Sequence, residues 1–383
     1  MKDIPLEDFF QAYFDCRKNK RNSLSSLEFE LDFESEVIKL YEEVNKSIYS
    51  VSPLDVFIKN KPVKREIFAA QFRDRVIHHL IVNKLNNLFE REFIYDSYSC
   101  REGKGTLFGI RRINNFMRKC SKNYQEDCWV LKADIKGYFM SINKDILVRK
   151  LINFILERYK EEDRERLLWL CKRVIYNNPT NDCLIKSPRI KWQGLPKSKS
   201  LFYSNKNCGL PIGNYTNQVF ANFYLNSLDH FIKSNLGVKF YGRYVDDFVI
   251  FHESKEHIKN IIPKIRSFLS EELKLELHPR KIYLQHYTKG ISFLGAFIKP
   301  WRIYSSRRIK GSFYKKIQEI NNKPNIKESI ENNNLASSVN SYLGEMSHFK
   351  TYKLRKRLLE SFNDSFWNFY KKGIHLRKIN LFL

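Results

Sequence analysis

The stretch KFYGRYVDDFVIF, residues 239–251, places two adjacent carboxylates, Asp246 and Asp247, inside an otherwise aromatic and β-branched run. Runs of this composition favour a β-strand. No Gly-Pro turn separates the two halves, so the simplest fold is a tight hairpin with both Asp residues at its tip. Burying two like charges without a counter-ion would cost several kcal/mol, and the stretch therefore predicts a nearby cation.

A third carboxylate, Asp134, ends another apolar run, CWVLKAD, which is typical of a buried strand. Strands of one sheet would bring it to the two Asp residues of the hairpin. Three oxygen ligands suit Mg²⁺, which keeps water and substrate phosphates in its shell. Two such ions about 4 Å apart activate a 3′-hydroxyl and stabilise a leaving pyrophosphate. The simpler alternative is a solvated β-turn at residues 246–247 and a helix cap at Asp134.

The charge of the chain indicates a polyanionic partner. Its 383 residues carry a net charge of +26 along the whole length, and 21 Tyr and 30 Phe offer rings for base stacking. The alternative is a basic protein whose charge only keeps it dispersed. The Cys and His residues form no CxxC or HExxH motif, which argues against a zinc site. Neither a signal peptide nor a long apolar run is recognised, so we expect a cytoplasmic protein without a membrane partner.

Pro300 marks a boundary between two parts of the sequence, and the second part is strongly basic. Within the N-terminal region, residues 1–50, the stretch from Leu6 to Tyr49 shows helical periodicity, for which we expect two helices, and the alternation that follows predicts a hairpin at residues 50–68. Residues 177–208 resemble a basic surface loop. From Trp301 onward there are 17 Lys or Arg against 6 Asp or Glu, a net charge of +11, mostly with helical spacing. We therefore expect one domain of mixed helices and strands and a second, basic helical domain.

The order of several motifs carries a family resemblance. YVDD, preceded by ADIKGYF and GLPIG and followed by PRKIYL and ISFLGAF, resembles the successive blocks of reverse transcriptases. The resemblance covers about residues 50–300. It implies an α+β right-hand polymerase fold, with fingers and an antiparallel palm sheet in residues 1–300 and a basic helical thumb in residues 301–383. Template RNA, the RNA/cDNA duplex and dNTPs would be the ligands.

The same resemblance assigns roles to single residues. It implies that Asp134, Asp246 and Asp247 bind two Mg²⁺ ions, for which Mn²⁺ can substitute. Lys281 would be a further catalytic residue that protonates the leaving pyrophosphate. The primer grip would be formed by Phe293, Leu294 and Gly295, where glycine lets the backbone approach the primer strand.

Nucleotide binding is assigned in the same way. Phe139, five positions after Asp134, would pack under the deoxyribose and exclude a 2′-hydroxyl. Arg65 and Arg73 fall where the fingers bind the triphosphate, since a guanidinium makes bidentate phosphate contacts. Which of these two and Lys64 makes that contact stays open.

One segment points to a subtype. KSLFYSNKNCGLPIGNYTNQVFANFYLNSLDHFIK closely resembles the corresponding stretch of diversity-generating retroelement reverse transcriptases, as does KREIFAAQFRDRVIHHLI. Group II intron enzymes typically show Gln-Gly and then Ser-Pro, where this chain has Ile212-Gly213 and Asn217-Gln218. Asn217 replaces the usual Ser of the diversity-generating pattern. Ile212, Gly213 and Gln218 would therefore lie at the nucleotide-binding site.

The subtype implies a function. Such enzymes copy a template-repeat RNA into cDNA with errors at adenines, and they work with a small, basic, oligomeric accessory variability protein in bacteria or phages. Two alternatives remain open. One is a defence-associated or group II intron-type reverse transcriptase with the same chemistry, and the other is a non-catalytic RNA-binding protein on a polymerase scaffold.

Overall fold

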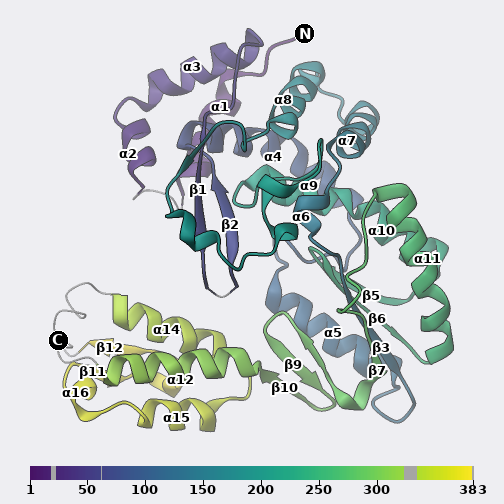
Figure 1. Ribbon diagram of the computed structural model, residues 1–383, viewed down its shortest axis with the longest axis vertical. Coiled ribbons are helices and arrows are strands. Elements are labelled where there is room, and N and C mark those ends of the chain that lie inside the picture. Colours follow the sequence, from purple (N-terminus) through teal and green to yellow (C-terminus); the bar gives the residue numbers. More distant parts are fainter. Residues whose placement is uncertain (19–22, 62, 323–333, 382–383) are drawn as a thin grey trace. The chain divides into compact units, whose positions relative to one another are not determined.

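The structure is a computed structural model that describes residues 1–18, 23–61, 63–322 and 334–381. The chain divides into two compact units. The first unit comprises Met1–Glu102, Ala133–Phe248 and Lys259–Ile282, and the second comprises Gly103–Lys132, Val249–Ile258 and Tyr283–Leu383. Figure 1 labels the helices and strands of both units.

The first unit begins with three short helices, of which the first two pack against a longer fourth helix (Figure 1). These are α1 (Leu6–Arg17), α2 (Leu24–Glu30), α3 (Phe33–Asn45) and α4 (Phe72–Glu92). The prediction of two helices before residue 50 is wrong, because Asp32 has φ −144° and ψ 56° and separates α2 from α3. Aspartate favours such a position at a helix start over a helix interior.

A small sheet with the strand order β2-β1-β4 follows the N-terminal helices. Its strands are β1 (Leu54–Lys59), β2 (Arg65–Ala69) and β4 (Cys183–Ile185). β1 and β2 form the predicted antiparallel hairpin, and β4 pairs with β1 in parallel. The stretch predicted to be a basic loop therefore also contributes a strand.

A four-stranded sheet with the order β5-β6-β3-β7 carries the three predicted Asp residues. Its strands are β3 (Trp129–Asp134), β5 (Phe240–Tyr244), β6 (Asp247–His252) and β7 (Tyr283–His286). The hairpin predicted at residues 239–251 is confirmed, with β5 and β6 separated by Val245 and Asp246 only. Residues 248–251 are all buried, which explains their apolar character.

Seven further α-helices lie between residues 103 and 282 in the described part of the chain. They are α5 (Thr106–Cys120), α6 (Tyr138–Ser141), α7 (Lys144–Arg158), α8 (Arg164–Tyr176), α9 (Tyr215–Tyr224), α10 (Asn226–His230) and α11 (Lys255–Leu273). Of these, α9 is buried along most of its length and packs against α4 and α7.

The second unit contains a three-stranded antiparallel sheet, β8 (Ile291–Phe293), β9 (Ala296–Lys299) and β10 (Arg302–Ser305). The apolar run ISFLGAFI is a hairpin whose turn is Leu294-Gly295. Both turn residues have positive φ, +48° and +86°, which is the pattern of a two-residue type I′ turn.

The basic C-terminal region is mainly helical, as predicted, and also contains a short hairpin (Figure 1). Its elements are α12 (Arg307–Asn321), α14 (Asn334–Ser347), α15 (Tyr352–Glu360), α16 (Asp364–Trp367), β11 (Tyr370–Lys372) and β12 (Ile379–Leu381). Phe313, Val339, Leu343 and Leu359 are at the centre of one apolar cluster that joins these helices.

Candidate active site

The turn between β5 and β6 presents the adjacent carboxylates. Val245 has φ +54°, in the left-handed region that is costly for a β-branched residue. Asp246 completes the turn and Asp247 begins β6, and both are half-buried. A backbone held in this conformation needs support from its surroundings.

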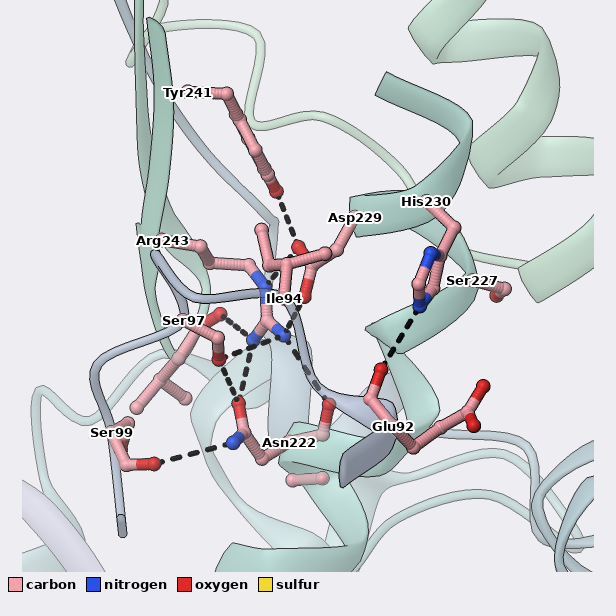
Figure 2. Close-up of polar contacts among 12 residues, drawn as sticks. Glu92, Ile94, Ser97, Ser99, Asn222, Ser227, Asp229, His230, Tyr241 and Arg243 are labelled. Carbon is pink, nitrogen blue, oxygen red and sulfur yellow. Dashed lines mark hydrogen bonds and ion pairs between the residues drawn. The ribbon is translucent and has the colours of Figure 1, made fainter. Parts of the chain in front are cut away.

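That support comes from Arg243, which is fully buried at the centre of a polar cluster (Figure 2). Its Nε lies 2.7 Å from Oδ1 of Asp229, and its Nη2 pairs with Oδ2 of the same carboxylate, which is also fully buried. Nη1 donates to Oδ1 of Asn222 and to the carbonyl oxygen of Val245, both at 3.0 Å. The Tyr241 hydroxyl donates to Asp229 at 2.6 Å. The cluster therefore fixes the turn from inside the protein.

The sequence alone does not predict this cluster. Arg243 is one of 68 basic residues and lies beside YVDD without a motif of its own. Asp229 lies on α10, and only the tertiary fold brings it to β5. The one available signal is that Arg243 interrupts the apolar residues of a predicted strand.

Asp134 lies at the end of β3 and forms an ion pair with Lys281. Lys281 Nζ is 2.8 Å from Oδ2 of Asp134. The backbone reinforces this arrangement, because His278 N–H donates to the Asp134 carbonyl at 2.8 Å and Lys281 N–H donates to the His278 carbonyl at 3.0 Å. Two residues predicted to be catalytic, 147 positions apart, are thus in direct contact.

The pKa of Asp246 shows that the carboxylates interact. Burial, together with the charges of Asp134 and Asp247, raises this pKa from 3.8 to about 6, although a backbone hydrogen bond and the Lys281 ammonium oppose the rise. All four side chains belong to the first unit. The structure therefore brings the three Asp residues and Lys281 into one electrostatic group.

The fit of this group to a divalent cation follows from its chemistry. Three mutually repelling carboxylates form an oxygen donor set that a divalent cation would stabilise. Among the residues that the structure describes, no group of three or more His, Cys, Asp or Glu is already arranged to hold a metal ion. Lys281 is the counter-ion of Asp134 here, so joint coordination would require the carboxylates to move closer together.

Phe139 and Ile212 lie against the same small apolar cluster, which includes Leu54, Val56 and Phe68. Phe139 is in the short helix α6 and is half-buried. Ile212 accepts a hydrogen bond through its carbonyl oxygen from Phe68 N–H, at 2.9 Å. The two predicted nucleotide-binding side chains therefore share one environment.

Gly213 has a steric reason to be glycine. Its φ is +132°, and a Cβ atom there would lie 2.8 Å from the carbonyl oxygen of Phe68. Gly213 thus allows the close approach of β2 to the segment that precedes α9.

Gln218 is exposed on α9 and accepts a hydrogen bond from the thiol of Cys100 at 3.3 Å.

The three cations predicted for the triphosphate differ in their surroundings. Arg73 forms an ion pair with Glu43 and lies over the ring of Tyr49, and Lys64 donates to the carbonyl oxygen of Gln193 at 2.7 Å. Arg65 is exposed at the start of β2. Burial raises the pKa of Tyr244, the residue before the turn, and the charge of Arg65 opposes that rise. Of the three, Arg65 is the one whose charge acts next to the YVDD turn.

The predicted primer-grip residues form the β8–β9 turn of the second unit. Phe293 is buried, with Lys132 Nζ 5.9 Å from the centre of its ring, and Leu294 and Gly295 form the turn itself. The Gly295 carbonyl accepts a hydrogen bond from Ser306 N–H at 2.9 Å. A non-glycine residue with positive φ at Leu294 is a locally strained conformation.

Comparison with known proteins identifies the family. The model for "Reverse transcriptase (RNA-dependent DNA polymerase)" matches residues 58–298, more than half of the chain. The chain therefore belongs to the reverse transcriptase family and has its right-hand polymerase fold. Enzymes with this domain generally use divalent metal ions.

Two curated relatives are intron proteins. A putative COX1/OXI3 intron 2 protein of Saccharomyces cerevisiae is 22% identical over 331 residues, which is 71% of this chain and 35% of that protein. Nuclear intron maturase 1, mitochondrial, of Arabidopsis thaliana is 22% identical over 311 residues, which is 63% of this chain and 42% of that protein. The chain thus spans well under half the length of these relatives.

Solved structures give more distant likenesses. Telomerase from Candida albicans in complex with a telomeric RNA fragment has a TM-score of 0.48 and 12% identity, covering 88% of this chain and 64% of that chain. Apo telomerase from Candida tropicalis has a TM-score of 0.49 and 12% identity, and the match covers 83% of this chain and 63% of that chain. Separately, no helix in the described part of the chain is long and apolar enough to cross a membrane.

Proposed function

We propose that this chain is the RNA-directed DNA polymerase of a diversity-generating retroelement, which copies a template-repeat RNA into cDNA with errors concentrated at adenines. The observation that carries the polymerase chemistry is the electrostatic group of Asp134, Asp246, Asp247 and Lys281. The family match supports the same reaction class.

In this proposal the three Asp residues hold two Mg²⁺ ions, or Mn²⁺ in their place. When bound, such ions activate a primer 3′-hydroxyl and stabilise the leaving pyrophosphate. The protonated Nζ of Lys281, beside Asp134, is the proton donor for that pyrophosphate. Arg243 and Asp229 keep the turn that carries Asp246 in position.

Arg65 is the fingers residue that we assign to the triphosphate. Its exposure and its electrostatic effect on Tyr244 support this choice, whereas Glu43 already neutralises Arg73. Phe139 is the proposed sugar gate. The basic residues 301–383 are the proposed thumb, and the β8–β9 turn is the proposed primer grip.

The subtype rests on sequence. Ile212-Gly213 and Gln218 match the diversity-generating pattern, in which Asn217 replaces the usual Ser, and they differ from the Gln-Gly and Ser-Pro of the intron pattern. The accessory variability protein, the dNTP substrates and a bacterial or phage origin with a cytoplasmic location belong to the same proposal.

A group II intron-type reverse transcriptase is the second candidate. It is favoured by the names of the two curated relatives, an intron protein and an intron maturase. The chemistry would be the same, so the two candidates differ in template and in fidelity.

The deciding experiment is primer extension by the full chain on one defined RNA, with Mg²⁺ and dNTPs, with and without the accessory protein, followed by sequencing of the cDNA. We expect extension with substitutions concentrated opposite template adenines. A uniform, low error rate would favour the intron-type candidate. A folded protein that extends no primer with either Mg²⁺ or Mn²⁺ would contradict the polymerase assignment.

A further inference from the structure

The second unit contains a cavity of about 840 Å³ with a strongly basic lining. It is bordered by β10, by the start of α15 and by the segment around His375. Its lining includes six Lys or Arg side chains and, within the described ranges, no Asp or Glu: Arg302, Lys350, Lys353, Arg355, Arg357 and Arg377. Such a concentration of one sign of charge attracts an anion.

Arg355 is the most informative of these residues. It is only 5% exposed, and in the described part of the chain no carboxylate forms an ion pair with it. Nη2 donates to the carbonyl oxygen of His375 at 3.1 Å and Nη1 to the hydroxyl of Thr351 at 3.5 Å, both of which are neutral acceptors. Nε has no hydrogen-bond partner there. A buried guanidinium in these surroundings is incomplete without an anion.

The charge on Arg355 is also electrostatically disfavoured. Burial lowers its pKa, and the neighbouring Arg377 lowers it further. Both effects would be relieved by an anion that approaches through the same cavity.

The N-terminus of α15 provides a second anion-binding feature at the same place. The hydroxyl of its N-cap residue, Thr351, donates to the carbonyl oxygen of Met346 and caps no N–H group of the helix. The first turn contains no acidic residue. Free N–H groups and the helix dipole at this position favour a phosphate.

Two exposed aromatic rings, Tyr304 and Tyr352, line the same cavity. They are 40% and 53% exposed, and the guanidinium of Arg302 lies 4.8 Å from the centre of the Tyr304 ring. Exposed rings beside phosphate-binding cations stack unpaired bases. A base inside a duplex is already stacked on its neighbours and cannot use them.

We propose that this cavity is a binding site for single-stranded RNA, in which one phosphate is bound by Arg355 and the N-terminus of α15 and an adjacent unpaired base stacks on Tyr352 or Tyr304. The site goes beyond polymerisation, because it selects unpaired RNA. It does not depend on whether the enzyme serves a retroelement or an intron.

The test uses the full chain and a short fluorescent oligoribonucleotide, single-stranded or annealed to its complement, with binding measured by anisotropy. The variant K353Q/R377Q removes two charges that line the cavity. Its matched control, K356Q/K378Q, removes two exposed charges from the same helix and the same C-terminal segment, outside the cavity lining. We expect the first variant to weaken single-strand binding about tenfold and duplex binding about twofold, and the control to change both by about twofold.

Tyr352→Ala tests the stacking, with Tyr314→Ala as the control, since Tyr314 is 50% exposed on α12 and does not line the cavity. We expect only Tyr352→Ala to weaken single-strand binding, by about fivefold or more. In the unmodified protein, RNA containing 4-thiouridine should crosslink to a peptide that carries Tyr304 or Tyr352.

Three results would overturn the proposal. One is an equal loss of single-strand binding in K353Q/R377Q and in its control. Another is an equal loss of duplex and single-strand binding in K353Q/R377Q. The third is displacement of the RNA by micromolar adenosine monophosphate, which would assign the cavity to a free nucleotide.

Discussion

Arg243 donates a 3.0 Å hydrogen bond from Nη1 to the carbonyl oxygen of Val245, the residue of the YVDD turn that has φ +54°. Such a backbone conformation costs about 1–3 kcal/mol in a non-glycine residue and persists where its surroundings enforce it. Because Asp229 holds the same guanidinium, a buried ion pair stabilises the turn that carries Asp246.

Arg243→Lys should therefore impair synthesis without removing the charge. A lysine ammonium cannot reproduce the guanidinium fork that contacts Asp229, Asn222 and Val245 together. We expect a loss of about 2 kcal/mol in the free energy of unfolding. We also expect a fall of about tenfold or more in the single-turnover extension rate. Urea unfolding and rapid-quench extension measure the two effects.

Arg158→Lys is the matched control for that prediction, because Arg158 pairs with Glu157 on the exposed face of α7. It should change neither quantity. If the Arg243→Lys protein folds and keeps the extension rate of the unmodified protein, the ion pair stabilises the core but does not position the turn.

Asp134→Asn and Asp246→Asn should each abolish cDNA synthesis while RNA binding persists. Removing a metal-binding carboxylate costs several kcal/mol of transition-state stabilisation, or about a thousandfold in rate. The basic C-terminal region would still bind phosphates. Primer extension and filter binding on the same preparations give the result, and the exposed Asp182→Asn is the control. Normal extension by a folded Asp246→Asn protein would refute the metal-ligand role.

The sequence predicted the hairpin at residues 239–251 because its apolar residues are the buried core of β6, a local pattern. It did not predict the Arg243–Asp229 pair, since β5 and α10 meet only in the tertiary fold. In the run ISFLGAFI the apolar residues continue through Leu294, so the sequence gives no sign of the turn that the positive φ of Leu294 and Gly295 reveals. Likewise, the burial of Arg355 depends on a segment about 20 residues later in the chain.

Phe139→Ala should relax the exclusion of ribonucleotides. The side chain is half-buried against the cluster that contains Phe68, so its removal opens space rather than changing charge. We expect the preference for dNTP over rNTP to fall by about tenfold, corresponding to about 1.4 kcal/mol. Single-nucleotide incorporation kinetics with each substrate measure this ratio, and the exposed Phe14→Ala is the control. An unchanged ratio would place the sugar gate at another residue.

His78 should make the protein less stable in acid. Burial, together with the charges of His79 and Arg75, lowers its pKa from 6.5 to about 3. The folded state therefore keeps the ring neutral, while the unfolded state binds a proton below about pH 6.5. The stabilisation is complete above that pH and is lost as the pH falls, by about 2 kcal/mol between pH 7.5 and pH 5.

Urea unfolding at several pH values tests the role of His78. Asn can replace Nδ1 as the hydrogen-bonding partner of the Thr216 hydroxyl, which lies 2.7 Å from that nitrogen, but it does not titrate. His78→Asn should thus flatten the pH dependence, and the exposed His230→Asn should leave it unchanged. An identical slope in all three proteins would show that another group causes the acid sensitivity.

Ile212→Gln should make the enzyme more accurate at adenine. Group II intron enzymes typically have Gln where this sequence has Ile212. In the proposed function this position lies at the nucleotide-binding site, where a Gln amide can form a hydrogen bond near the nascent base pair and a branched aliphatic side chain cannot. Ile212 lies against the same apolar cluster as Phe139 and is only half-buried, so the fold should tolerate the polar replacement. Suppose that a contact of about 1.4 kcal/mol stabilises the transition state for the correct nucleotide and not that for an incorrect one. It then changes the discrimination between the two nucleotides about tenfold.

We therefore expect Ile212→Gln to lower misincorporation opposite template adenine more than opposite the other three bases, with a modest loss of total synthesis. The measurement is sequencing of cDNA made by both proteins on one RNA at the same Mg²⁺ and dNTP concentrations. Val51→Gln, which introduces the same amide at another residue packed against this cluster, is the control for general disturbance. If an active, folded Ile212→Gln enzyme keeps the adenine error rate of the unmodified protein, the errors arise from other contacts, such as those of the fingers or the accessory protein.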